Sequence, residues 1–118
     1  GNAGSYEGLE WMKRAHIASV AIGRGVEDFF DQHLCQKVDV YLSGHDHNRQ
    51  WLDPFCNVEL IVTGAAAKLT PLRGRGNGTR FEDDDTAGFV WLELDQNCLT
   101  GVMVDEEGRE QYRHHFCK

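Results

Sequence analysis

The chain has 118 residues, a formal net charge of −7 and a hydrophobic fraction of 41%. This length fits one modest domain with its own buried core. The acidic balance, from 19 acidic and 12 basic residues, disfavours a protein that holds nucleic acid or anionic lipid on a basic face. The sequence also lacks the roughly 18 consecutive apolar residues of a membrane span. We therefore expect no nucleic-acid partner and no membrane insertion.

The first residues resemble a loop rather than a natural amino terminus. Position 1 is Gly, and residues 1–6 are mostly small or polar. No signal-peptide pattern of basic, apolar and small-residue regions is present. We expect the chain to be part of a longer protein, whose missing segment can carry a targeting signal.

The middle of the chain predicts a helix followed by two strands. Apolar residues recur every three or four positions from Val26 to Leu34, which indicates one face of a helix. Residues 38–43 are rich in β-branched and aromatic side chains and predict a strand buried on both faces except at Asp39. Residues 58–63 predict the next strand. This order of elements favours a layered α/β fold.

The four cysteines, Cys35, Cys56, Cys98 and Cys117, do not have Cys-x-x-Cys spacing, which disfavours a structural zinc site. Cys35 lies at the end of the predicted helix, and Cys56 lies just before the second predicted strand. A disulfide between these two is one interpretation and implies an oxidising compartment. Buried free thiols are the other, because cysteine is among the most buried residue types.

Residues 65–85 predict a long irregular loop that is rich in glycine and charge. Loops of this length are usually functional or disordered. A solvated loop of mixed charge is the simple interpretation. The alternative is that Arg73, Arg75 or Arg80 reaches an anionic substrate, since a guanidinium matches the geometry of phosphate.

The remaining residues predict an antiparallel meander with strands at 88–94, 99–104 and 109–116. In the last strand Tyr112, His114 and Phe116 share one face. His114 and His115 then point to opposite faces, which makes them a poor metal-binding pair. We interpret both as structural.

The most informative motif is Gly44-His45-Asp46-His47, directly after the strand predicted at 38–43. Gly44 lets the chain leave the strand sharply, so the two imidazoles can serve neighbouring metal ions. The carboxyl ends of strands in α/β sheets are also common ligand sites. We expect His45 and His47 to be metal ligands, and Asp46 to point away from the metals and orient a neighbour.

The segment 42–48, Leu-Ser-Gly-His-Asp-His-Asn, resembles the last metal-binding motif of the calcineurin-like metallophosphoesterases. It is most similar to the purple (tartrate-resistant) acid phosphatase branch. The strand before the motif, the exit at 50–52 and the segment 62–67 also resemble this family, as does the loop at 1–4. The resemblance covers most of the chain and is strongest over residues 35–70.

The resemblance implies an α/β fold, specifically the C-terminal part of a four-layer α/β/β/α sandwich around two metal ions. Those ions are iron together with zinc, manganese or a second iron. His45 is then a ligand of the divalent metal and His47 a ligand of the ferric ion. The implied activity is that of an acid phosphatase-like hydrolase, in which a hydroxide bound by both metals hydrolyses a phosphomonoester substrate. The resemblance also implies an exported protein, secreted or periplasmic.

The sequence departs from the family because the family's other ligand motifs are absent. Asn2 follows a glycine but lacks the histidine of Gly-Asn-His. We therefore expect residues 1–118 to be the C-terminal fragment of a single metallophosphoesterase domain whose N-terminal half is absent. Alone, such a fragment should be inactive.

Three other interpretations remain open. The chain can be a non-enzymatic module in which His45 and His47 hold one metal ion. It can be part of another hydrolase such as an amidohydrolase, which is disfavoured because a meander rather than repeated strand–helix units follows the motif. The histidines can also lie in a turn without metal. The sequence sets neither the substrate nor the oligomeric state.

Overall fold

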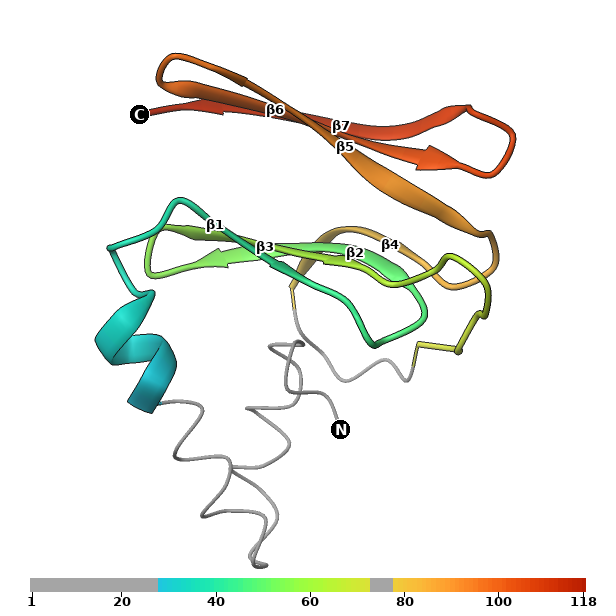
Figure 1. Cartoon of the computed structure of the whole chain (residues 1–118), viewed down its shortest axis with the longest axis horizontal. Helices are drawn as coiled ribbons and strands as arrows, with labels where there is room; N and C mark the ends of the chain where they lie inside the picture. Colours follow the sequence, from blue (N-terminus) through green and yellow to red (C-terminus); the bar gives the residue numbers. More distant parts are fainter. Residues whose placement is uncertain (1–27, 73–77) are drawn as a thin grey trace, which may run out of the picture.

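The computed structural model describes residues 28–72 and 78–118, which form two sheets lying face to face (Figure 1). The first sheet has the strand order β1-β3-β2-β4, and the second has the order β5-β6-β7. The strands of the first sheet are β1 (Val40–Ser43), β2 (Arg49–Phe55), β3 (Val58–Thr63) and β4 (Thr79–Asp83). Those of the second sheet are β5 (Gly88–Asp95), β6 (Cys98–Asp105) and β7 (Glu110–Cys117).

The first sheet is mixed and the second is antiparallel. Strand β1 runs parallel to β3, whereas β2 is antiparallel to both of its neighbours, β3 and β4. A tight turn joins β2 to β3, with positive φ at Cys56 (44°) and Asn57 (67°). Two successive left-handed residues are the requirement of the hairpin turn whose twist matches the twist of its strands.

The main core lies between the sheets. Trp51 and Ile61 of the first sheet pack against Leu99 and Met103 of the second, and all four are nearly inaccessible to solvent. Gly101 makes room for the indole, because a Cβ at that position would lie 2.5 Å from ring carbons of Trp51. The position of the tryptophan therefore depends on a glycine in the facing sheet.

A second core covers the other face of the first sheet. Phe30, from the helical residues 28–33, packs with Leu52, Val58 and Leu60. Strand β3 is consequently buried on both faces, which explains why it is apolar except at Glu59 and at its last residue, Thr63. The described residues thus form three layers, a helical segment, a mixed sheet and an antiparallel sheet (Figure 1).

A buried arginine connects the two sheets. Arg49 of β2 is fully buried, and its Nη1 donates a hydrogen bond to the carbonyl oxygen of Val104 (2.8 Å). Its Nη2 donates to Thr86 Oγ1 (2.6 Å) and Gln111 Oε1 (2.5 Å), and it also pairs with the carboxylate of Asp83. Burial alone raises the pKa of Asp83, but hydrogen bonds from Thr86, the backbone N–H of Asp85 and Arg49 together lower this pKa below its usual value.

Much of the predicted secondary structure is confirmed. The strands expected at 38–43 and 58–63 correspond to β1 and β3, and the meander corresponds to β5, β6 and β7. Helix is present over residues 28–33 of the predicted helical stretch. Of the two interpretations of Cys35 and Cys56, the disulfide is the one formed, and a second disulfide joins Cys98 to Cys117.

Other expectations were wrong. Residues 65–85 are not wholly irregular, because β4 lies within them and pairs with β2, a strand that was itself not predicted. Strand β1 is not buried on both faces: it is an edge strand among the described residues, and the Leu42 side chain is 49% exposed. The expected α/β class is confirmed only in part, since the described residues are mostly β and form three of the four expected layers.

Among the described residues, no helix has both the length and the apolar character needed to cross a lipid bilayer.

Candidate metal site

The histidine motif lies at the edge of the first sheet where the parallel strands β1 and β3 both end. Ser43, the last residue of β1, is in register with Val62 near the end of β3. Arg49 begins the antiparallel β2 opposite Thr63. The loop 44–48 and the segment that follows Thr63 therefore leave the same edge of the sheet. This is the position at which ligands commonly bind in sheets with parallel strands.

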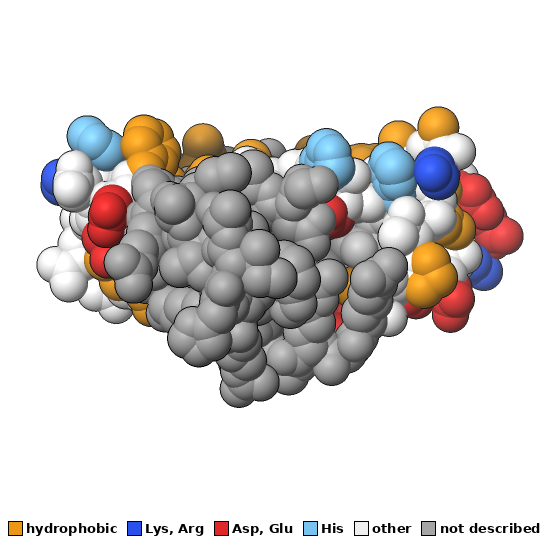
Figure 2. All heavy atoms as spheres, turned by 90° about the horizontal axis from the view of Figure 1, so that it is seen from below, with side chains coloured by type: hydrophobic (Ala, Val, Ile, Leu, Met, Phe, Trp, Pro, Cys, Tyr) orange, Lys and Arg blue, Asp and Glu red, His pale blue; other side chains and the backbone are white. Residues whose placement is uncertain are grey.

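His45 turns out of the strand into solvent. Its φ is 73°, in the left-handed region, and its side chain is 70% exposed. Nδ1 of His45 lies 3.7 Å from Oδ1 of Asp46, whose side chain is 16% exposed. The sharp exit occurs at His45 and not at Gly44, where a Cβ would have no heavy atom within 4 Å. Histidine side chains lie at the surface of the face shown in Figure 2.

His47 is held by the segment after β3. Its Nδ1 lies 3.1 Å from Oγ1 of Thr70, and its carbonyl oxygen accepts a hydrogen bond from the backbone N–H of Thr70 (2.9 Å). If Nδ1 carries the proton and donates it to Oγ1, the lone pair of Nε2 is available to a metal ion. This is the arrangement that usually orients a metal-binding histidine.

The motif loop and the segment after β3 touch directly. The backbone N–H of Gly64 donates to the carbonyl oxygen of Asn48 (3.1 Å). A Cβ on Gly64 would lie 2.0 Å from the carbonyl oxygen of Asp46, so no larger residue fits without moving the loop. The buried Asn48 accepts a hydrogen bond from Gln50 Nε2 (2.7 Å), which assigns its amide a local structural role.

The donor set of this edge is small. Within residues 28–72 and 78–118, no group of three or more His, Cys, Asp or Glu side chains with converging ligand atoms includes His45 or His47. Imidazole nitrogens suit zinc and iron, so the two histidines fit the expected metals in type. Two ligands do not complete a metal centre of either kind.

Arg80 does not lie in an open loop as the sequence suggested. It belongs to β4, and its Nη1 donates hydrogen bonds to both carboxylate oxygens of Glu59 (3.1 Å each) and lies 2.8 Å from His114 Nε2. Glu59 also accepts a hydrogen bond from Trp51 Nε1 (2.6 Å). The guanidinium is occupied by this structural network. The other two arginines considered, Arg73 and Arg75, lie outside the described residues.

Comparison with known proteins shows that the fold has been seen before in a solved structure. No family model matches the sequence. The fold matches that of GAP50, described as the anchor in the inner membrane complex of Plasmodium, with a TM-score of 0.66 and 22% identity, over 83% of this chain and 30% of that one. At this identity the match shows the fold alone.

The particular relatives are tartrate-resistant acid phosphatases. The chain is 29% identical over 84 residues to the human type 5 enzyme and 31% identical over 84 residues to that of Mus musculus. Each match covers 64% of this chain and 26% of the relative. The chain thus spans about a quarter of the length of these relatives. The resemblance inferred from the histidine motif, to acid phosphatases of the metallophosphoesterase type, is confirmed as a distant and partial similarity.

Proposed function

We propose that this chain contributes part of the two-metal centre of a phosphomonoesterase, with His45 and His47 as ligands. The observation that carries the proposal is the placement of both histidines at the carboxyl ends of a parallel strand pair, with Nδ1 of His47 held by Thr70. The partial similarity to tartrate-resistant acid phosphatases supports the same chemistry. In this proposal His45 binds the divalent metal and His47 binds iron.

The remaining ligands come from a longer protein, of which residues 1–118 form the C-terminal part of one domain. When bound, such a centre supplies the positive charge that stabilises the attacking and leaving oxygens of phosphoester hydrolysis. The role of this chain is to position the imidazole side chains of His45 and His47. Thr70 orients His47, and the close contact between Gly64 and Asp46 sets the position of the loop.

The setting of this activity is an oxidising compartment. Cysteines 35, 56, 98 and 117 are all paired in disulfides. Such bonds persist mainly in exported proteins and are rare in the cytosol. We propose a secreted or periplasmic phosphatase that acts on phosphomonoesters.

The second candidate is a non-enzymatic module that binds one metal ion through His45 and His47. Two observations favour it. The described residues bring no third ligand to these histidines. One solved structure with a matching fold is of a protein described as an anchor.

The test is to express the protein from a coding sequence extended upstream of Gly1, and to measure bound metals and hydrolysis of a chromogenic phosphomonoester. We expect two metal ions per chain, with activity at least tenfold lower in His45→Ala and His47→Ala. The matched control is His33→Ala, an exposed helical histidine. Residues 1–118 alone should show no turnover.

Two results would contradict the phosphatase proposal. One is an extended chain that binds a single metal ion and lacks activity, which supports the binding module. The other is an active extended chain whose rate is unchanged in both histidine variants, which excludes them as ligands.

A further inference from the structure

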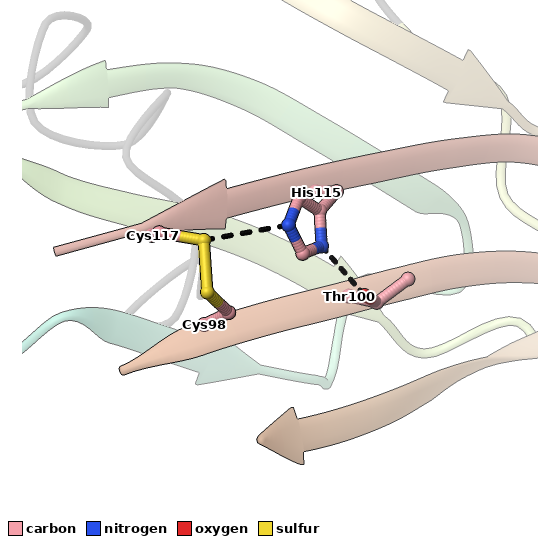
Figure 3. The surroundings of a disulfide bond; sticks show 4 residues. All are labelled: Cys98, Thr100, His115 and Cys117. Carbon is pink, nitrogen blue, oxygen red and sulfur yellow. Dashed lines mark hydrogen bonds between the residues drawn. A yellow bond between two sulfur atoms is a disulfide. The ribbon is translucent and has the colours of Figure 1, made fainter. Parts of the chain in front are cut away.

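The far end of the second sheet holds a second cluster of metal-binding residue types. Cys98 of β6 and Cys117 of β7 are directly opposite in the strand register, with their Cα atoms 4.0 Å apart. His115 precedes Cys117 by two residues and therefore projects from the same face of β7. Figure 3 shows its imidazole beside the disulfide.

The geometry of this cluster is close to that of a zinc site. Nε2 of His115 lies 3.4 Å from Sγ of Cys117, and one ligand atom from each residue lies within 4.8 Å of the others. A tetrahedral zinc ion with bonds of about 2.3 Å to sulfur and about 2.0 Å to nitrogen holds these ligand atoms about 3.5–3.8 Å apart. The imidazole is therefore already in place, and only the two sulfurs need to separate.

A partner for the other imidazole nitrogen is also present. Nδ1 of His115 lies 2.8 Å from Oγ1 of Thr100, the residue directly opposite it on β6 (Figure 3). If Nδ1–H donates to this hydroxyl, the lone pair of Nε2 points toward the sulfurs. A hydrogen bond of this kind fixes the tautomer and the orientation of a metal-binding histidine.

We propose that the Cys98–Cys117 disulfide masks a metal site, in which Cys98, Cys117 and His115 bind one Zn²⁺ ion once the bond is reduced. A dithiol donates two electrons and two protons to the disulfide, so that it becomes a disulfide itself and leaves two cysteine thiols. The two thiols release their protons to solvent as their sulfurs bind the zinc ion. His115 supplies a neutral nitrogen, and water takes the fourth position.

The site is accessible and separate from the histidine motif. His115 and Cys117 are exposed on β7, an edge strand of the second sheet in the described chain. Lys118, the next residue, pairs with Asp39, which immediately precedes β1. His45 and His47 follow the opposite end of β1. Neither ligand set therefore depends on the other, and the proposal does not rest on the phosphatase function.

The first experiment is a cobalt titration of the full chain before and after reduction with a phosphine, followed by displacement with Zn²⁺. Co²⁺ is used because bonds from thiolate to cobalt give a charge-transfer band. We expect no such band in the oxidised chain and one Co²⁺ per chain with the band after reduction. The β-sheet signal in circular dichroism should be retained in the cobalt-bound form.

Variants assign the ligands. His115→Gln should weaken cobalt binding about tenfold or more and change the spectrum, whereas the matched control His33→Gln should change neither. Thr100→Val should weaken binding about 10–100-fold, since it removes only the orienting hydrogen bond. The double variant Cys35→Ser/Cys56→Ser should retain the band, because the other cysteine pair is not part of the site.

Several outcomes would overturn the proposal. They are equal binding by the oxidised and reduced chains, a reduced chain without the band at stoichiometric cobalt, or a reduced chain that loses its sheet signal and does not recover it with cobalt. Unchanged affinity in His115→Gln would show that the cysteines bind without the imidazole. Loss of the band in a folded Cys35→Ser/Cys56→Ser variant would show that the other cysteines supply the ligands.

Discussion

The guanidinium of Arg49, on β2, donates a hydrogen bond to the carbonyl oxygen of Val104, on β6, across 2.8 Å. A fully buried cation thus connects two sheets whose remaining contacts are mostly apolar. Its charge is balanced by Asp83, at the end of β4. This hydrogen bond fixes the orientation of one sheet relative to the other. The buried charge of Arg49 is tolerated only while Asp83 balances it.

Replacing Arg49 should consequently be costly. We expect Arg49→Met to lower the free energy of unfolding by about 3–5 kcal/mol, because Asp83 loses its partner in a mostly buried site. Urea denaturation measures the effect. The matched control is Arg113→Met, which breaks the exposed pair with Glu110 and should cost less than about 1 kcal/mol. Equal effects of the two substitutions would show that Arg49 adds nothing beyond a surface ion pair.

Gly101 should not tolerate a side chain. In Gly101→Ala the new methyl group would lie 2.5 Å from ring carbons of Trp51 and force the two sheets apart or the indole aside. We expect a loss of about 1–3 kcal/mol in unfolding free energy together with altered tryptophan fluorescence. Gly44→Ala is the control, because a Cβ there has no heavy atom within 4 Å. An unperturbed Gly101→Ala variant would contradict the tight packing of the sheets.

Thr70 should control metal affinity at the histidine motif without touching the metal. Removing its hydroxyl in Thr70→Val leaves the His47 imidazole without its 3.1 Å contact. In the extended protein we expect metal affinity to fall about 10–100-fold, measured by competition with a chelator. Thr79→Val, which removes a weak 3.4 Å contact to Glu82, is the control. Equal affinities in both variants would remove Thr70 from the site.

Asp105 should make the fold sensitive to acid. Its buried carboxylate accepts hydrogen bonds from the backbone N–H groups of Arg109 (2.8 Å) and Glu107 (3.0 Å) and from the Arg109 side chain. The Arg109 N–H is the largest cause and lowers the pKa of Asp105; burial opposes it, and the other two bonds add to the lowering.

Because the folded-state pKa of Asp105 is the lower one, its stabilisation is present above the unfolded value of about 3.9 and is lost as the pH falls through the folded value. We expect Asp105→Asn to be less stable than the parent chain at pH 7, with a smaller decline in urea midpoint below about pH 4. Asp95→Asn, at the exposed end of β5, is the control. A parallel acid decline in the parent and Asp105→Asn would exclude this carboxylate as the cause.

The sequence predicted the elements whose residue pattern matches their burial. Strand β3 is apolar because both of its faces are covered, and the meander has clear turns. Strand β2 was not predicted, for two reasons. Pro54 lies within it, and its first residues are buried although two of them, Arg49 and Gln50, are polar. The hairpin turn at Cys56-Asn57 also lacks the glycine that usually marks such a turn.

The two candidate sites also differ in how far the sequence alone could predict them. His45 and His47 are separated by a single residue, so a short sequence motif was sufficient to single them out. The cluster of Cys98, His115 and Cys117 depends on the pairing of β6 with β7, which brings residues 19 positions apart into contact. Arg80 was misread because a charged strand that pairs with a buried network resembles a solvated loop. Knowledge of the strand register would have revealed the cluster and placed Arg80 in a strand.

The backbone of His45 has an evolutionary consequence. A left-handed φ of 73° in a residue other than glycine costs of the order of 1 kcal/mol, and solvent surrounds most of the side chain. Because the side chain is mostly exposed, packing does not offset this strain. Selection for stability alone would favour glycine or asparagine at this position. If His45 binds metal as we propose, this position exchanges stability for activity, and His45→Gly or His45→Asn should raise the free energy of unfolding while lowering metal affinity.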